Sequence, residues 1–308
     1  MTTEKYTVQY GQNIFDVCLA IYGSIEGLLD LMVCNPELSV DTELNYGDVL
    51  LYSPYYTEDD SVLSTYKEEN TIPANGTSHI YFKPTKSIVM FFVFPAEEYL
   101  ASMKLSGSGE ITIDWGDDSD LEPVVLTSGV TEIVHAYPQT DSKAHIARFY
   151  GSDVTLYSLN ANGLKMDAMH VINKVRIDNL FLSECGKLNL SFLKLVNRTL
   201  NLDFSGSKVS GLEGLISCKT AYNISLADCG LSTEEIDAYL IGMVKNYDER
   251  LACTVNLIGN DKPSGTYQEP EDLLNPQSGL EAIYVIVNYH KEYNGTWAFI
   301  IDDNNIYQ

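Results

Sequence analysis

The stretch YTVQYGQNIFDVCLAIYGSIEGLLDLMVCNPELSVDTELNYGDVLLYSP, from Tyr6 to Pro54, has the pattern of a complete small domain. Apolar residues alternate with polar ones near both of its ends, as they do in half-buried strands. Between the ends, apolar residues recur at helical spacing, first over Ile14–Ile21 and then over Leu28–Met32. The stretch therefore predicts a strand, two helices and a second strand, with the strands paired and both helices on one face of the pair.

The predicted helices have recognisable ends. Asn13 is a good N-cap for the first helix, with Asp16 three residues later, and Gly23 supplies the left-handed residue that closes it. Ser24 is placed to cap the second helix. Pro36 disfavours the helical conformation of the residue before it, so we expect this helix to end there.

The stretch resembles the LysM family at the residues that define the family. The matching features are Tyr6-Thr7-Val8, Gly11-Gln12, Ile14-Phe15-Asp16-Val17, Tyr22-Gly23, Leu28 to Leu31, Asn35-Pro36, Leu44, Gly47 and Val49-Leu50-Leu51. Members of this family commonly bind N-acetylglucosamine-containing glycans such as peptidoglycan. The resemblance implies a glycan- or partner-binding site in two loops, made of Gly11, Gln12, Asn13, Asn35, Pro36 and Leu38. Similar modules are also structural parts of bacteriophage tails and baseplates, and this stretch is more similar to that second group.

The charge of the chain argues against two classes of partner. Its 308 residues include 43 acidic and 19 basic side chains, which give a formal net charge of −24. A surface this acidic repels phosphate backbones and anionic lipids, so we expect no nucleic-acid partner and no membrane partner. The sequence also contains no run of 18 apolar residues, so no membrane-spanning helix is predicted.

The N-terminus, MTTEKYTVQYG, contains no apolar segment of the kind found in signal peptides, and we therefore expect no secretory signal. A cell-wall-binding LysM protein normally has to be exported, whereas a phage tail protein is assembled in the host cytoplasm. This favours a location in a virion. The cysteines form no Cys-x-x-Cys pair, and we expect them to be reduced core residues rather than disulfides. They are Cys18, Cys34, Cys185, Cys218, Cys229 and Cys253.

A polar, acidic segment follows the first domain and predicts a linker. After it, short strand-like segments alternate with turn signals, which is typical of a β-sandwich. The predicted strands are His79–Phe82, Ile88–Phe94, Ile111–Trp115, Val124–Leu126, Thr131–His135 and His145–Phe149. The sequence Ser106-Gly107-Ser108-Gly109 is interpreted as one of the turns between these strands.

The segment Ile111–Ser119, ITIDWGDDS, followed by His135-Ala136-Tyr137, resembles the polycystic-kidney-disease-type (PKD) sandwich, although Asp118 stands where that family has glycine. Four carboxylates crowd into this turn, and oxygen donors of this kind bind Ca²⁺. They are Asp114, Asp117, Asp118 and Asp120. The alternative is an acidic turn whose carboxylates accept backbone N–H bonds. We favour that alternative and expect no other cofactor. For His135, we favour a partly buried side chain bonded within the same motif.

From Tyr150 onward the chain repeats. Leu159, Leu182, Phe204, Leu226 and Leu257 occupy equivalent positions at steps of 23, 22, 22 and 31 residues. This period and the L-x-L-x-x-(N/C) shape resemble leucine-rich repeats, each of which adds one strand to a parallel sheet. A helix that begins with the Ser232–Glu235 capping box accounts for the longest step. A helix over Gly279–Tyr293 and a strand over Trp297–Ile301 are interpreted as a C-terminal cap.

The sequence therefore predicts a multidomain α+β chain. Its parts are a βααβ LysM domain (1–54), a linker (55–77), a PKD-like β-sandwich (78–150) and a short leucine-rich-repeat solenoid with a C-terminal cap (151–308).

No catalytic signature is present: the sequence has no Gly-x-Ser-x-Gly, His-Glu-x-x-His or P-loop motif. We expect a non-enzymatic structural or interaction protein of a bacteriophage virion, in the tail or baseplate, within a symmetric assembly. The first domain would dock onto other virion proteins, and the repeat domain would present a binding surface. The alternative is a peptidoglycan- or carbohydrate-binding LysM protein, and a host surface is a further candidate partner. Several tyrosines are candidates for such an interface. They are Tyr55, Tyr56, Tyr150, Tyr157, Tyr289 and Tyr293.

Overall fold

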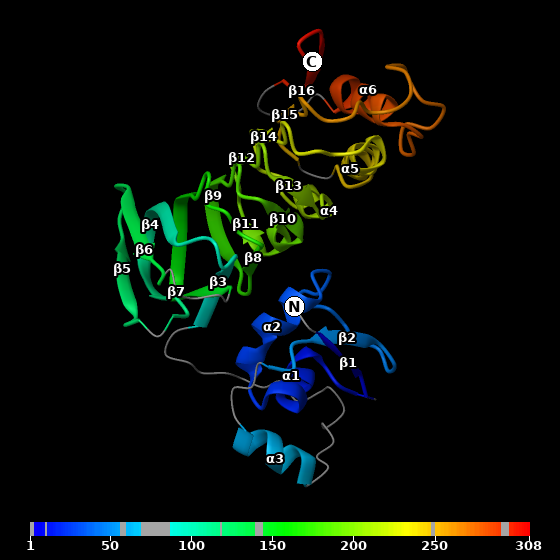
Figure 1. Cartoon of the computed structure of the whole chain (residues 1–308). Coiled ribbons are helices and arrows are strands. Elements are labelled where there is room, and N and C mark those ends of the chain that lie inside the picture. Colours follow the sequence, from blue (N-terminus) through cyan, green and yellow to red (C-terminus); the bar gives the residue numbers. More distant parts are fainter. Residues whose placement is uncertain are drawn as a thin grey trace. The chain divides into compact units, whose positions relative to one another are not determined.

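A computed structural model describes residues 3–9, 11–55, 60–68, 87–117, 119–138, 144–247, 250–290 and 296–308. The chain forms two compact units, Met1–Pro84 and Thr85–Gln308, which we call the N-terminal unit and the large-sheet unit (Figure 1). The predicted strand His79–Phe82 and the candidate residues Tyr56, Asp118 and Tyr293 lie outside the described residues.

The N-terminal unit is built on two antiparallel strands, β1 (Glu4–Thr7) and β2 (Val49–Tyr52). Between them lie α1 (Ile14–Tyr22), the 3₁₀-helix η1 (Ile25–Gly27) and α2 (Leu28–Cys34), and α3 (Asp60–Glu68) follows β2. The fully buried Val17, Tyr22 and Leu31 belong to the core of this unit.

The helix ends in this unit confirm the predicted caps. Asn13 and Asp16 form a complete capping box, and Gly23 closes α1 with a φ of 73°. The Ser24 side chain caps η1, a short 3₁₀ turn that precedes α2, so the second predicted helix begins as two elements. Within the described residues no single helix is long and apolar enough to cross a membrane. The pair Ile14–Tyr22 and Ile25–Cys34 reaches that length and composition only together, with a bend of 109° between them.

The large-sheet unit begins with β3 (Ser87–Phe94), β4 (Leu100–Asp114), β5 (Glu122–Leu126), β6 (Thr131–Ala136) and β7 (His145–Asn160). Short strands follow: β8 (Ala168–Val171), β9 (Val175–Phe181), β10 (Lys187–Asn189), β11 (Val196–Asn197), β12 (Asn201–Asp203), β13 (Lys208–Ser210), β14 (Asn223–Ser225), β15 (Thr254–Asn256), β16 (Ala298–Asp302) and β17 (Asn305–Tyr307). The helices among them are η2 (Leu190–Leu195), α4 (Glu213–Ile216), α5 (Thr233–Lys245) and α6 (Gly279–Tyr289).

The predicted fold class is wrong. We expected a multidomain α+β chain with a βααβ LysM domain, a separate β-sandwich and a leucine-rich-repeat solenoid with its own cap. Instead, strands predominate in the described residues, and 13 of these strands form one large mixed sheet. Its main path runs β17-β16-β15-β14-β12-β9-β7-β3-β8, and β4 joins β5 and β6 to β7. The strands assigned to a sandwich and those assigned to a solenoid are thus hydrogen-bonded into a single sheet.

Two long strands make the sheet continuous. The first half of β7 pairs with β3, its second half pairs with β9, and β4 runs alongside both halves. The register between β4 and β7 shifts at Ser106/Gly107 and at Ser108/Glu110, so the predicted turn is a pair of irregularities inside one strand. At Gly107 a Cβ atom would lie 2.1 Å from the carbonyl oxygen of Thr155. Glycine permits this close approach of two backbones, and bulges bend a strand.

The strands after β7 pair in parallel at a regular register. Leu159, Leu180, Leu202, Ile224, Val255 and Phe299 are aligned in turn, at steps of 21, 22, 22, 31 and 44 residues. We expected Leu159 to be equivalent to Leu182 in the first step of the repeat, and this alignment is wrong. The equivalent residue is Ala161, whose backbone N–H donates to the Phe181 carbonyl oxygen as that of Leu182 donates to the Asp203 carbonyl oxygen. The predicted capping box of the inserted helix α5 is confirmed at Ser232 and Glu235.

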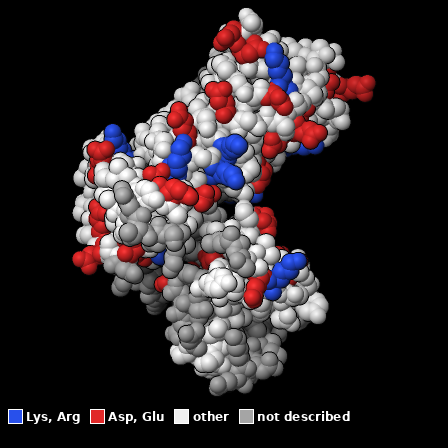
Figure 2. All heavy atoms as spheres, in the orientation of Figure 1, with Lys and Arg blue, Asp and Glu red and all other residues white. Residues whose placement is uncertain are grey.

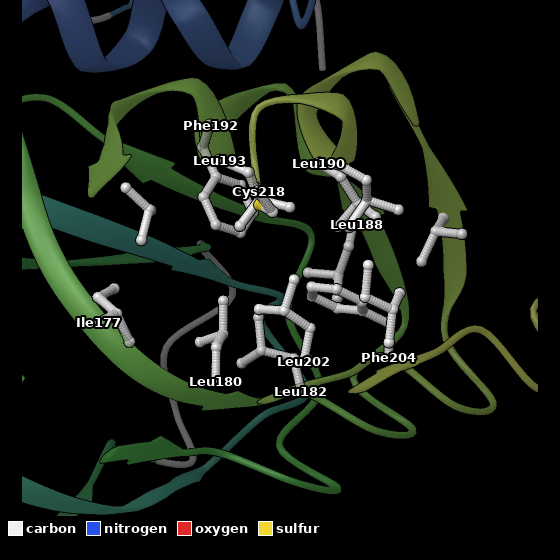
Figure 3. Close-up of a cluster of buried hydrophobic side chains, with 14 of the residues drawn as sticks. Ile177, Leu180, Leu182, Leu188, Leu190, Phe192, Leu193, Leu202, Phe204 and Cys218 are labelled. Carbon is white, nitrogen blue, oxygen red and sulfur yellow. The ribbon is translucent and has the colours of Figure 1, made fainter. Parts of the chain in front are cut away.

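One side of the parallel strands faces the hydrophobic core. Figure 3 shows Leu180 of β9 and Leu202 of β12, with Leu182 and Phe204 just after these strands, on the side of Phe192 and Leu193 of η2. All of these side chains are buried. The helices α4, α5 and α6 lie along the same side of the strands in Figure 1. All six cysteines are free and five are buried, with Cys34 half-buried, which agrees with the predicted reduced state.

Candidate binding face

The opposite side of the same strands carries polar side chains, and we call it the open face. Successive strand residues point to opposite faces, so the neighbours of the buried Leu180, Leu202 and Ile224 point away from the helices. The open face consists of Lys104, Ser158, Asn160, Asn179, Phe181, Asn201, Asp203, Asn223, Ser225, Thr254, Asn256, Ala298 and Ile300. Every one of these side chains is half-buried or exposed. They form one surface across β4, β7, β9, β12, β14, β15 and β16.

An asparagine ladder crosses the centre of the open face. The Nδ2 of Asn223 donates to the Oδ1 of Asn201 at 2.7 Å, and the Nδ2 of Asn201 donates to the Oδ1 of Asn179 at 2.6 Å. The Nδ2 of Asn179 donates to the carbonyl oxygen of Tyr157 at 2.6 Å. An amide group has two N–H donors and one acceptor oxygen. Each ladder residue therefore keeps one N–H that no bond among the described residues uses.

A second row beside the ladder combines hydroxyl, carboxylate and aromatic groups. The Oδ1 of Asp203 accepts the backbone N–H of Ser205 at 3.0 Å, and the Ser205 and Ser225 hydroxyls lie 2.8 Å apart. Phe181 is aligned between Asn160 and Asp203 and is half-buried. The row therefore places one aromatic ring among small groups that both donate and accept hydrogen bonds.

A cleft lies where the open face meets β4 and β6. Its volume is about 480 Å³, and it is lined by Glu98, Leu100, Ser102, Met103, Lys104, Glu132, Asn160, Asn162, Gly163 and Leu164. Lys104 and Glu132 are cross-strand neighbours on β4 and β6 and form an ion pair at 4.0 Å, with both side chains more than half exposed. Such an exposed pair contributes little to stability, and its two groups are accessible to a ligand. Leu100 is 52% exposed and gives the cleft an apolar part.

The loop residues predicted to bind a ligand in the N-terminal unit are held by internal bonds. The buried Gln12 bonds through its Oε1 to the backbone N–H of Gln9 at 2.7 Å and through its Nε2 to the Tyr6 hydroxyl at 2.8 Å. Asn13 accepts the backbone N–H groups of Phe15 and Asp16. These amide groups fix the start of α1.

The second predicted loop has the same character. The buried Asn35 donates to the carbonyl oxygens of Leu31 and Leu51 at 2.7 Å each, and its Oδ1 accepts the backbone N–H of Leu51 at 2.8 Å. Leu38 is also buried, whereas Pro36 is exposed. Gly11 is half-buried at a turn, with a φ of 80°. Asn35 therefore ties α2 to β2.

The acidic turn of the large-sheet unit is a bonded network. The Oδ2 of Asp117 lies 2.8 Å from the Nε2 of His135, and its Oδ1 accepts the hydroxyl of Ser119 at 2.6 Å. Burial by itself would raise the pKa of Asp117, but the hydrogen bonds from Ser119 and His135 outweigh it and hold that pKa below its usual value. His135 also stacks on Trp115, with ring centroids 4.5 Å apart, which confirms the predicted role within the motif.

Asp114 accepts the backbone N–H of Gly116 at 2.9 Å and pairs with Arg148 at 3.3 Å, while Asp120 is exposed. Among the described residues no three His, Cys, Asp or Glu side chains gather where they could hold a metal ion, and Asp118 lies outside those residues. The order of the network is Ser119–Asp117–His135. A nucleophilic serine needs the histidine beside it as base, and here the carboxylate lies between the two.

Three of the candidate interface tyrosines are exposed: Tyr55, Tyr157 and Tyr289. The Tyr289 hydroxyl donates to Glu269 at 2.8 Å, and Tyr150 is half-buried. An interface role for these residues stays a prediction.

The sequence reasoning missed the asparagine ladder. Its members, Asn179, Asn201 and Asn223, are spaced at 22 residues, which matches the aligned register of β9, β12 and β14. The available signal was an asparagine placed directly before each of the buried residues Leu180, Leu202 and Ile224 and repeated at the same spacing.

A scan of protein-family models, a search of curated proteins and a search of solved structures found no match to this chain.

Proposed function

We propose that this chain is a non-enzymatic structural or interaction protein of a bacteriophage virion, in the tail or baseplate, and that the open face is its binding surface. The observation that carries the proposal is the asymmetry of the parallel strands. Their one side packs on η2, α4, α5 and α6, and their other side displays amides and hydroxyls with unused hydrogen-bonding capacity. Polar groups arranged in rows on a rigid sheet suit recognition, because their positions are set before a partner arrives.

We also propose that the chain is not an enzyme. His135 is bonded to Asp117 and stacked on Trp115. These two contacts support a structural role for His135, because they join β6 to Trp115 and Asp117 in the turn that follows β4. The expectation of a tail or baseplate location comes from the sequence resemblance. We expect the N-terminal unit to dock onto other virion proteins in a symmetric assembly, which leaves the open face for a further partner.

Purified particles test the virion assignment. The chain should co-purify with intact particles through a density gradient, at a copy number that matches a symmetry of the tail or baseplate. Recovery of the chain only as a free protein, in lysates that contain assembled particles, would contradict the assignment.

The alternative is a peptidoglycan- or carbohydrate-binding protein that acts through the N-terminal loops. It is favoured by the exposed Pro36 and Glu37, which leave part of one loop accessible. Sedimentation with purified peptidoglycan separates the two proposals. Retention that is lost on Glu37→Lys, and kept in a variant of the cleft beside the open face such as Ser102→Trp, would favour the alternative.

A further inference from the structure

We infer that the cleft between β4, β6 and β7 binds a neutral saccharide, which extends over the neighbouring Phe181 of the open face. The inference rests on the proposed function, because it names the ligand class of the same face. The cleft has a volume of about 480 Å³, within the range of about 300–1,000 Å³ usual for ligand sites.

The groups that line the cleft match hydroxyl-rich ligands. The Oδ1 atoms of Asn160 and Asn162 already accept backbone N–H groups, so these two residues offer their Nδ2 donors. Ser102 offers both a donor and an acceptor, Glu132 offers acceptors and Lys104 offers donors. Glu98 accepts the backbone N–H of Lys165 with its Oε2 and adds a second carboxylate oxygen. A sugar hydroxyl both donates and accepts, so it is satisfied by such a mixed set. A ligand without hydroxyl groups would leave these polar groups unpaired, at a cost in affinity.

Apolar groups lie beside the polar ones. Leu100 is 52% exposed in the cleft, and Phe181 is aligned next to Asn160 on the adjacent strand. The face of an aromatic ring carries negative charge density, and the C–H groups on one side of a sugar ring are complementary to it. The cleft and Phe181 therefore offer hydrogen bonds to the edge of a sugar and an apolar contact to its face.

Charge favours a neutral ligand. Acidic side chains are spread over the surface of the large-sheet unit in Figure 2, and the chain as a whole carries −24. The cleft itself holds Glu98 and Glu132 against Lys104. This field repels sulfated, sialylated and phosphorylated polymers.

A protein partner fits the cleft less well. Protein interfaces have an apolar centre rich in aromatic side chains and arginine. The open face instead presents mainly small polar groups. The backbone N–H and C=O groups of β7 are also used in its pairing with β4 and β9. A strand from a partner protein therefore finds no unpaired strand edge at β7.

A substitution that fills the cleft with a large side chain tests the inference. Ser102→Trp would place a large ring in the cleft on a half-buried strand position, where aromatic residues are tolerated. The matched control is Ser210→Trp, because Ser210 is an exposed serine of β13, in the separate two-stranded sheet with β10. Glu132→Gln is a milder second variant that keeps the shape of the side chain.

The full chain is applied to a panel of immobilised neutral oligosaccharides together with their sialylated and sulfated counterparts. The affinity for the strongest neutral member is then measured by titration calorimetry. We expect Ser102→Trp to weaken binding by about tenfold or more, Glu132→Gln to weaken it by about threefold, and Ser210→Trp to leave it unchanged.

The other outcomes overturn the inference. These are no retention of any neutral oligosaccharide, retention of only the anionic counterparts, or equal binding by Ser102→Trp and its control. Binding of a virion protein that Ser102→Trp abolishes, without any saccharide binding, would also overturn the saccharide assignment. That last result would leave the proposed function standing, because the open face would still be the binding surface.

Discussion

In the N-terminal unit the amide of Asn35 is buried and bonded to the backbone at three points, whereas the amides of Asn179, Asn201 and Asn223 lie in a row at the surface of the large sheet. The side-chain chemistry is the same in both places. The difference is that the buried Asn35 uses both of its N–H donors within the fold, while each ladder residue keeps one N–H that no bond among the described residues uses. A polar residue in a loop is thus a binding candidate only when the fold does not use its atoms.

The largest expected effect concerns the continuity of the large sheet. In Gly107→Ala the added methyl group would lie 2.1 Å from the Thr155 carbonyl oxygen, so β4 and β7 could not keep their pairing. We expect a loss on the order of 4 kcal/mol in the free energy of unfolding. Both tryptophans, Trp115 and Trp297, belong to the large-sheet unit, so urea unfolding followed by tryptophan fluorescence reports on it alone.

Gly129→Ala is the control, because the nearest atom to its added Cβ would be 3.6 Å away. A small and equal effect of the two substitutions would contradict the close pairing of β4 with β7. It would reopen the possibility of a turn at this point of the sequence.

Asn35→Ala should destabilise the N-terminal unit by about 3 kcal/mol, because it leaves both the N–H and the C=O of Leu51 without their partner. Hydrogen exchange of peptides from β1, α1, α2 and β2 should accelerate, while the tryptophan fluorescence transition stays unchanged. The neighbouring exposed Glu37→Ala is the control. Unchanged exchange in Asn35→Ala would show that this amide is free for another role.

Acid should weaken the large-sheet unit through His170. This imidazole is buried and stacked on Phe91, with centroids 4.7 Å apart, and burial lowers its pKa from 6.5 to about 4. Below pH 6.5 the unfolded chain takes up a proton that the folded chain refuses until about pH 4. The stability is therefore complete above pH 6.5 and falls by about 2 kcal/mol on going to pH 5.

Fluorescence-detected urea unfolding at pH 7, 6 and 5 measures this loss. The variant His170→Phe keeps a ring beside Phe91 and cannot titrate, so its stability should depend less on pH. The same pH dependence in both proteins would show that His170 is accessible to protons in the folded state.

The smallest expected effect is that of Asn201→Ala. This residue bonds to both Asn179 and Asn223, but all three are at a surface where water replaces a lost partner. We expect a loss of about 1 kcal/mol in the fluorescence-detected transition. A loss as large as that of Asn35→Ala would remove the distinction between the two sites and would argue that the ladder is structural.

Local signals in the sequence predicted local structure well. The capping boxes at Asn13 and Ser232 depend on residues within one helical turn, and both are present in the structure. The same holds for the buried strand Ile88–Phe94, whose apolar run lies within β3.

Long-range pairing was harder to predict. Serine and glycine are frequent both in turns and in strand irregularities, so Ser106–Gly109 could not reveal that β4 continues through them. The first repeat was misaligned by two residues because Leu159 and Ala161 both fit the apolar pattern. At the site, Gln12 and Asn35 were selected by resemblance, and the sequence pattern does not reveal that the fold bonds their amides internally.

The most direct test of the account compares one variant from each region. Its central claim is that ligand recognition takes place in the cleft and on the open face beside it, and not at the N-terminal loops. The affinity of the full chain for the neutral oligosaccharide selected from the panel is measured for Ser102→Trp and for Glu37→Lys. The account predicts that Ser102→Trp binds about tenfold or more weakly while Glu37→Lys binds as tightly as the unmodified chain. A loss of binding in Glu37→Lys, with Ser102→Trp unaffected, would contradict it.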